Sequence, residues 1–237
     1  MKQSTINEKT NWIAKYNNFI KNLREFPANS KIIMVLRHSH REKTNDWSKF
    51  ADIKLTELGH ETAINFGKQL PNDRPIRIYH SFIERCKETA EDILKGFKSI
   101  SGNGELIGPL NELFDIGVKS KAFLKEFVKY QNEKFIFRWA AGLFSPKLIA
   151  PLQEYSQKAA NIIWKGLELA PNRCIDIHVT HDLMLLSLRF GWFGLPPTEE
   201  WVDFLSGFAF TIRGSKIRLL DIENFKIIET PYWWKSQ

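Results

Sequence analysis

Polar side chains capable of chemistry follow three predicted strands of the chain. The first of these, residues 32–36, is a short continuous apolar run, which is typical of a strand that is buried on both faces of a parallel sheet. In an open parallel sheet, ligands bind at the carboxyl ends of the strands. We therefore expect these clusters to converge on one pocket. They are Arg37-His38 after residues 32–36, Ser81 and Arg85 after residues 76–79, and His181-Asp182 after residues 175–180.

These residue types suit the capture of a phosphoryl group. A guanidinium group matches phosphate oxygens with two parallel N–H donors, which a lysine ammonium cannot do. The candidate phosphate ligands are Arg37, Arg41 and Arg85. Ser81 and Glu84 form a capping-box pattern, which predicts a helix that starts at this point. Arg85 would then lie in the first helical turn, where backbone N–H groups and the helix dipole also favour an anion.

His38 is the candidate nucleophile. A neutral imidazole attacks phosphorus well, and neighbouring cations would disfavour its protonated form. His181 could donate a hydrogen bond to the equatorial oxygens as charge shifts in the transition state. A general acid must also protonate the leaving oxygen. The available carboxylates are Asp182 and Glu112.

Four segments, in order, resemble the histidine phosphatase (phosphoglycerate mutase-like) superfamily. Residues 36–41, Leu-Arg-His-Ser-His-Arg, resemble its Arg-His-Gly opening, and residues 55–59, Leu-Thr-Glu-Leu-Gly, resemble its next segment. Residues 79–90 are similar to its Ser-x-x-x-Arg-x-x-x-Thr-Ala stretch, and residues 179–182 to its second-histidine motif. The resemblance implies a phosphohistidine intermediate on His38. It also implies a phosphate pocket formed without a metal, by Arg37, Arg85 and His181.

The resemblance leaves the general acid open. Arg41 and the pair His181-Asp182 match the acid-phosphatase branch, in which the aspartate is the proton donor. Leu110-Asn111-Glu112 instead resembles the mutase branch, in which the glutamate after Leu-Asn is the acid. We favour Asp182, because its bond to His181 keeps it near the pocket.

One position departs from the family pattern. Ser39 stands where the family has glycine, a residue that permits unusual backbone angles or a close approach of phosphate. Serine is small and can donate a hydrogen bond, so we expect activity to be retained.

The elements that must position these residues alternate between strand and helix. This alternation predicts an α/β fold, a three-layer α/β/α sandwich with a mostly parallel central sheet and an antiparallel hairpin at residues 208–222. The whole chain, residues 1–237, is expected to form one domain, with an amphipathic N-terminal helix over 9–26. Residues of about 117–157 interrupt the alternation and are interpreted as a helical cap insertion.

Composition limits the partners. The 237-residue chain has 43% hydrophobic and 26% charged residues and a formal net charge of +7. That positive excess favours an anionic partner, and the lack of a dense Lys/Arg run favours a small phosphorylated substrate over nucleic acid. Trp233-Trp234 could either dock the C-terminal segment or form a contact within a homodimer.

The sequence also predicts the cellular location of the protein. The sequence shows no signal-peptide pattern and no apolar stretch of the ~20 residues that a membrane span needs. Its two cysteines do not suggest a disulfide framework. We therefore expect a cytoplasmic protein that has no membrane partner and needs no cofactor.

Three other functions stay open. A phosphoglycerate mutase-like phosphotransferase would return the phosphoryl group from His38 to its substrate. A metal-dependent hydrolase could use His38, His40 and the group His178, His181 and Asp182 as ligands, although the adjacent arginines would repel a cation. A non-catalytic phosphate-ligand binder would form no phosphoenzyme.

Overall fold

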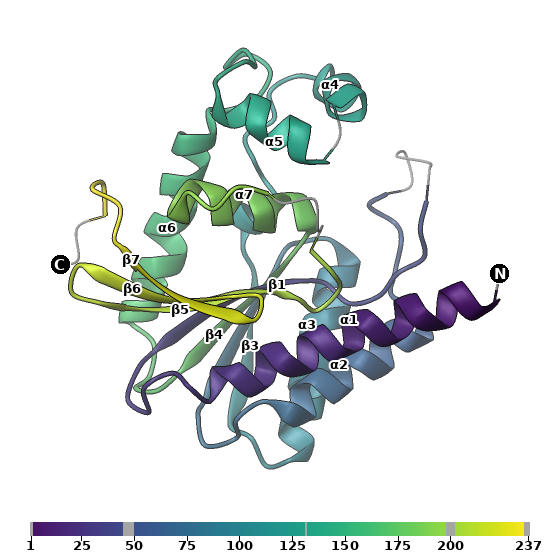
Figure 1. The fold of residues 1–237 in the computed structure, drawn as a ribbon, viewed down its shortest axis with the longest axis vertical. Coiled ribbons are helices and arrows are strands. Elements are labelled where there is room, and N and C mark those ends of the chain that lie inside the picture. The colour runs from purple at the N-terminus through teal and green to yellow at the C-terminus, as the bar shows by residue number, and fades with distance from the viewer. Residues whose placement is uncertain (1, 45–49, 131, 198–201, 235–237) are drawn as a thin grey trace.

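A computed structural model describes residues 2–44, 50–130, 132–197 and 202–234, arranged as a sheet between two layers of helices (Figure 1). The described helices are α1 Lys2–Leu23, α2 Glu57–Gln69, α3 Glu84–Ser99, the 3-10 helix η2 Asn111–Leu113, α4 Phe123–Tyr130, α5 Asn132–Ala140, α6 Leu152–Glu168 and α7 Asp182–Phe193. The described strands are β1 Ile32–Arg37, β2 Ile76–His80, β3 Gly104–Pro109, β4 Ile175–Thr180, β5 Gly207–Arg213, β6 Lys216–Asp221 and β7 Asn224–Glu229. The predicted α/β class is confirmed.

The strands form a seven-stranded sheet in the order β3-β2-β4-β1-β5-β6-β7. The four strands β3, β2, β4 and β1 are parallel, and β5, β6 and β7 continue the sheet in antiparallel fashion. The predicted hairpin is confirmed as β5–β6, where Gly214 has a φ of 59° that suits a tight turn. Strand β7, which the sequence pattern does not predict, pairs with β6 and lengthens the antiparallel part of the sheet.

Each face of the sheet packs against its own hydrophobic core. Residues 32, 34 and 36 of β1 pack into the core shared with α1, α2 and α3, whereas Ile33 and Val35 pack into the core shared with α6 and α7. Because successive side chains of a strand point to opposite faces, a strand covered on both sides must be apolar throughout. This explains the uninterrupted apolar run that ends at the reactive cluster Arg37-His38.

Helix α1 begins earlier than the predicted range 9–26 and runs along the outside of the sheet layer (Figure 1). Its described inner face consists of Trp12, Tyr16, Phe19, Ile20 and Leu23, all buried. The spacing of three and four residues places these side chains on one helical face. The helix therefore covers β1 and the neighbouring strands from the side of α2.

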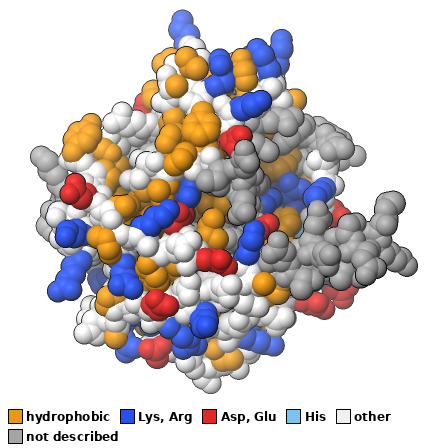
Figure 2. All heavy atoms as spheres, in the orientation of Figure 1, with side chains coloured by type: hydrophobic (Ala, Val, Ile, Leu, Met, Phe, Trp, Pro, Cys, Tyr) orange, Lys and Arg blue, Asp and Glu red, His pale blue; other side chains and the backbone are white. Residues whose placement is uncertain are grey.

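Helices α4 and α5 lie within the predicted insertion and project from one end of the molecule (Figure 1). Rings of the two helices pack on one another and on the loop that follows, with Phe135 in contact with Phe123, Phe127 and Phe144. Lysine and arginine side chains gather on this projection (Figure 2). Helix α6 starts at Leu152, inside the end of the predicted range, and its buried side chains, including Trp164, join the core of the sheet. Within the described part of the chain, none of the helices has the length and apolar character needed to cross a membrane.

Helices α2 and α3 approach so closely that only glycine fits at their contact. A Cβ atom on Gly67 would lie 2.1 Å from the carbonyl oxygen of Ile93, and one on Gly96 would lie 2.0 Å from that of Ile64.

We expect Gly67→Ala to lower the free energy of unfolding by about 1–3 kcal/mol, because the helices must separate. Gly166→Ala in α6 is the matched control, since its Cβ would meet nothing within 4 Å. Urea denaturation measures the free energy of unfolding of both variants. Equal stability of the two variants would contradict the close-contact explanation.

Candidate active site

The register of the parallel strands explains why distant residues meet. Arg37 of β1 pairs with Thr180 of β4, so His38 and His181 occupy adjacent positions just beyond the sheet. His80 of β2 pairs with Val179, which places Ser81 at the same edge. The backbone continues this pairing, with the N–H of His38 donating to the carbonyl of Thr180. The predicted convergence of the three strand ends is therefore present in the structure.

The guanidinium of Arg85 lies between the two histidines. Its Nε donates to Nε2 of His38 at 3.1 Å, and its Nη2 donates to Nδ1 of His181 at 3.0 Å. Its Nη1 donates to the backbone carbonyl of Phe50 at 2.7 Å. The side chain is fully buried, and burial lowers the pKa of Arg85 to about 10. Arg85 comes from the first turn of α3, as predicted.

These contacts define the protonation of both rings. Nδ1 of His38 lies 2.7 Å from the carbonyl oxygen of Ser39, which can only accept, so Nδ1 carries the proton and Nε2 holds a lone pair. Nδ1 of His181 accepts from Arg85, so Nε2 carries the proton and donates to the hydroxyl of Ser81 at 3.0 Å. The ring centroids of the two histidines are 5.3 Å apart.

The surroundings keep both histidines neutral. Burial is the largest cause that lowers the pKa of His38 well below its usual value, and the charges of His181, Arg37 and Arg85 act in the same direction. Burial and Arg85 likewise lower the pKa of His181, against the opposing charge of Asp182. A neutral His38 with its lone pair on Nε2 is the form that a nucleophile requires.

Arg37 and Asp182 form an ion pair beside the histidines. Nη2 of Arg37 is 2.9 Å from Oδ2 of Asp182, and Nη1 donates to the carbonyl of Val202 at 2.6 Å. The carboxylate of Asp182 remains one-quarter exposed, and its other oxygen accepts the backbone N–H of Leu183. Asp182 is thus both adjacent to the histidines and accessible to solvent.

Arg41 and Phe50 also lie close to Arg85. The ring of Phe50 is 4.3 Å from Cζ of Arg85 and 5.0 Å from Cζ of Arg41, so it faces both guanidinium groups. Burial lowers the pKa of Arg41, the charge of Arg37 adds to this effect, and that of Asp182 opposes it. All three predicted arginines therefore lie within reach of one another's charge.

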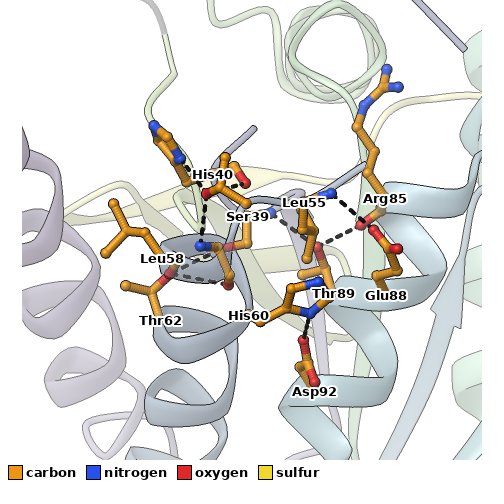
Figure 3. Close-up of polar contacts among 12 residues, drawn as sticks. Ser39, His40, Leu55, Leu58, His60, Thr62, Arg85, Glu88, Thr89 and Asp92 are labelled. Atoms are coloured by element: carbon orange, nitrogen blue, oxygen red, sulfur yellow. Dashed lines mark hydrogen bonds and ion pairs between the residues drawn. The ribbon is translucent and has the colours of Figure 1, made fainter. Parts of the chain in front are cut away.

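Helices α2 and α3 hold the segment that follows β1 (Figure 3). Ser39 donates from its hydroxyl to the carbonyl of Gly59 at 2.7 Å and lies 3.0 Å from the hydroxyl of Thr62. Its backbone N–H donates to Thr89, whose own hydroxyl donates to the carbonyl of Arg85. The Ser39 side chain is fully buried and directed into α2. Serine is accommodated here because Gly59 and Thr62 satisfy its hydroxyl.

Glu112 is the other predicted carboxylate. It lies in η2, with Oε1 3.4 Å from Nζ of Lys158 on α6, and its side chain is largely buried. Its neighbour Phe114 reaches the site, with its ring 5.4 Å from that of His181. The direct partners of Glu112 thus lie on α6, whereas Asp182 contacts Arg37 inside the histidine–arginine cluster.

Two features of the site differ from the sequence analysis. The predicted capping box is wrong: α3 begins at Glu84 with Ile83 as its N-cap and without a side-chain cap, because Ser81 hydrogen-bonds His181 instead. The aromatic residues Phe50 and Phe204 were not predicted, although both face arginines of the cluster. Phenylalanine carries no polar signal, and only the fold shows which ring lies against which cation.

Comparison with protein-family models assigns residues 33–207 to the histidine phosphatase superfamily, branch 1. The chain belongs to this family. The matched segment contains every predicted site residue and ends within β5. Helix α1 and the strands β6 and β7 lie outside it. A search of curated proteins found no significant match.

Solved structures share the fold of this histidine phosphatase superfamily member at low sequence identity. YhfR of Bacillus stearothermophilus matches with a TM-score of 0.57 and 18% identity over 82% of this chain and 98% of its own. A mutant phosphoserine phosphatase from Entamoeba histolytica, in complex with phosphoserine, matches with a TM-score of 0.54 and 18% identity, covering 82% and 96% of the two chains. A mycobacterial glucosyl-3-phosphoglycerate phosphatase matches with a TM-score of 0.52 and 15% identity, over 86% of this chain and 97% of its own.

The histidines that a metal site would need have other partners. Nδ1 of His40 lies 2.7 Å from the hydroxyl of Thr56, and His178 stacks on Tyr79 with 4.8 Å between centroids. Over the described ranges, no three His, Cys, Asp or Glu side chains are grouped as metal ligands. The described cluster of this family member is instead dominated by guanidinium groups.

We expect His38 and His181 to become protonated only at a pH well below 6.5, at which an ordinary histidine is half protonated. The reason is that a lowered pKa moves protonation to more acidic pH. Heteronuclear NMR titration of the imidazole nitrogens, assigned with single His38 and His181 variants, measures this. The urea-unfolded chain is the control, in which both rings should titrate near 6.5. Titration of either ring near 6.5 in the folded protein would contradict the electrostatic description.

Proposed function

We propose that this protein hydrolyses a phosphomonoester through a phosphohistidine intermediate on His38, without a metal ion. The observation that carries the proposal is the position of Arg85, whose N–H groups meet the lone pair of His38 and the ring of His181. A phosphoryl group bound at this guanidinium would lie next to Nε2 of His38. The family and its phosphatase neighbours support a hydrolase over the other functions considered.

The reaction follows from the groups present. Oxygens of the substrate phosphate replace the imidazole nitrogens as acceptors for Arg85, which frees the lone pair on Nε2. Nε2 of His38 attacks phosphorus, the bond to the leaving oxygen breaks, and a carboxylic acid protonates that oxygen. Water then attacks the phosphohistidine while the carboxylate left by the first step accepts its proton, the N–P bond breaks, and inorganic phosphate, neutral His38 and the carboxylic acid are restored. Arg37, Arg41 and Arg85 stabilise the charge on the equatorial oxygens.

The hydroxyl of Ser81 holds His181 in place during these steps. When the phosphoryl group draws Arg85 away, Nδ1 of His181 can accept the proton of a substrate monoanion and donate it as a hydrogen bond to a phosphoryl oxygen, while Nε2 keeps its own proton and still donates to Ser81. A small phosphorylated substrate, such as those named for the related phosphatases, is proposed for this chain as well. The buried free cysteines Cys86 and Cys174 are compatible with the proposed cytoplasmic location.

The decisive experiment is a hydrolysis screen over small phosphomonoesters with a chelator present. Wild type should release inorganic phosphate, and His38→Ala should abolish turnover because no nucleophile remains. His60→Ala is the matched control, since His60 pairs with Asp92 on the surface of α2 and α3 and should retain activity. Reactions quenched in alkaline denaturant, in which the N–P bond is stable, should contain phosphohistidine in the wild type and His60→Ala, and none in His38→Ala. Full activity of His38→Ala would refute the mechanism, and isomerisation without phosphate release would support the mutase alternative.

A second experiment separates the two candidate acids. Asp182→Asn should lower kcat on an alkyl phosphate by roughly 10²–10⁴-fold, whereas Glu112→Gln should have a smaller effect, because Asp182 lies among the reacting groups. With p-nitrophenyl phosphate, whose leaving group needs little protonation, Asp182→Asn should recover most of its activity. The reverse ranking of the two variants would assign the acid to Glu112. A loss of equal size on both substrates would show that Asp182 acts only through Arg37.

A further inference from the structure

A short segment outside the catalytic motifs holds the end of β1. Residues 202–206 run beside Arg37 and bind both of its backbone polar groups: Arg37 donates to the carbonyl of Ser206 at 3.0 Å and accepts from the N–H of Leu205 at 3.2 Å. The carbonyl of Val202 binds the Arg37 guanidinium. Leu205 is fully buried and has a φ of 54°, a left-handed conformation that costs free energy in a residue other than glycine. The surrounding packing therefore imposes this backbone shape.

The ring of Phe204 projects from this segment toward the reactive residues. It lies 4.4 Å from Cζ of Arg37, and its centroid is 5.8 Å from that of His38 and 5.1 Å from that of His40. The negative face of an aromatic ring attracts a guanidinium group, and more strongly where water is excluded. Because Arg37 and Arg85 repel each other, a neutral ring that attracts Arg37 helps to keep it beside His38.

Helix α1 secures this arrangement from outside the family segment. Trp12 packs edge-on against Phe204, with 5.9 Å between centroids, and stacks on His40 at 6.2 Å with an interplanar angle of 9°. One turn further, Nζ of Lys15 lies 3.0 Å from a carboxylate oxygen of Asp203. Helix α1 thus contacts both the 202–206 segment and the loop that carries His38.

We propose that Phe204 is a positioning residue for Arg37 and His38, and that Trp12 of helix α1 keeps the Phe204 ring in place. The positioning role in turnover rests on the proposed function, whereas the contacts of Phe204 and Trp12 do not depend on it. Phe204 does not touch the substrate; it acts through the two residues that do. An N-terminal helix that lies outside the family-matched segment is thereby made part of the catalytic apparatus.

Phe225 provides a matched control. It is also partly buried, with Cζ of Arg218 4.4 Å from its ring and Phe26 packed against it, but it lies on β7, away from the histidines. Phe204→Leu and Phe225→Leu therefore remove the same kind of cation–π contact and similar packing. Thermal unfolding should show losses of similar size in the two variants.

Steady-state kinetics in the full-length protein tests the positioning role. Phe204→Leu should lower kcat/KM by about 3- to 30-fold, with most of the loss in kcat, because a displaced His38 affects attack more than binding. Phe204→Tyr, which keeps the aromatic face, should stay within about 3-fold of wild type, and Phe225→Leu should match wild type. Equal kinetics of Phe204→Leu and Phe225→Leu, or an equal loss in Phe204→Tyr and Phe204→Leu, would overturn the proposal.

A double-mutant cycle tests the role of helix α1. Trp12→Leu should lower kcat/KM in the same direction, and the Trp12→Leu/Phe204→Leu double variant should be little worse than Phe204→Leu alone, because both changes disturb one contact chain. Strictly additive effects would remove Trp12 from the proposal.

An NMR titration without substrate separates this inference from the proposed function. Phe204→Leu should raise the pKa of His38 toward 6.5, because water enters and Arg37 is no longer held beside the ring, while His181 and Arg85, the other groups facing His38, stay in place. Phe225→Leu should leave the titration unchanged. If His38 shifts but no phosphomonoester is hydrolysed by wild type, only the proposed function fails. If wild type is active and His38 titrates identically in both variants, only the role of Phe204 fails.

Discussion

The site depends on a buried guanidinium whose direct partners are neutral. Removing a cation from water is costly unless hydrogen bonds and favourable electrostatics compensate. Arg85 meets this requirement with two imidazole nitrogens, one backbone carbonyl and the face of Phe50. A carboxylate in the same place would have neutralised the charge. With neutral acceptors the positive charge is retained, and the cluster is suited to a dianionic ligand.

The same arrangement determines the state of the histidines. Each imidazole must present a lone pair to Arg85, so each must be neutral, and the surrounding cations together with burial lower both pKa values. Arg85, which can only donate, takes Nε2 of His38 and Nδ1 of His181 as acceptors, so the proton of each ring lies on the other nitrogen, where the carbonyl of Ser39 and the hydroxyl of Ser81 accept it. The charge on the arginines and the nucleophilic form of His38 are thus two consequences of one electrostatic arrangement. An arriving phosphate competes for the same N–H donors and thereby releases the lone pair that attacks it.

The sheet and the helices supply the rigidity that this cluster needs. Parallel register places residues 38, 81 and 181 beside one another, and the buried hydrogen bonds of Ser39, Thr62 and Thr89 attach the first of these loops to α2 and α3. A Cβ on Gly59 would lie 2.2 Å from the carbonyl oxygen of His40. The glycine at this position therefore permits the close approach of α2 to the loop that follows β1. On the opposite side, residues 202–206 bind the backbone of Arg37. Repulsion among the three arginines is therefore opposed by contacts from α2 and α3 and from the 202–206 segment.

The sequence alone determined the class of the fold and the principal members of the site, because both depend on local patterns. An apolar run marked the buried strand 32–36, alternating apolar residues marked the strand 175–180, and strand ends followed by Arg, His and Asp marked the chemistry. The sequence could not determine which partner each side chain contacts. Ser81 has the spacing of a helix cap, yet it bonds His181, because β2 and β4 bring the two together across a hundred residues. Phe50, Phe204 and Trp12 carry no polar signal, and only the packed structure places their rings against cations and imidazoles. Tertiary contacts decided these points, since hydrogen-bond and cation–π energies depend on distances that sequence spacing does not specify.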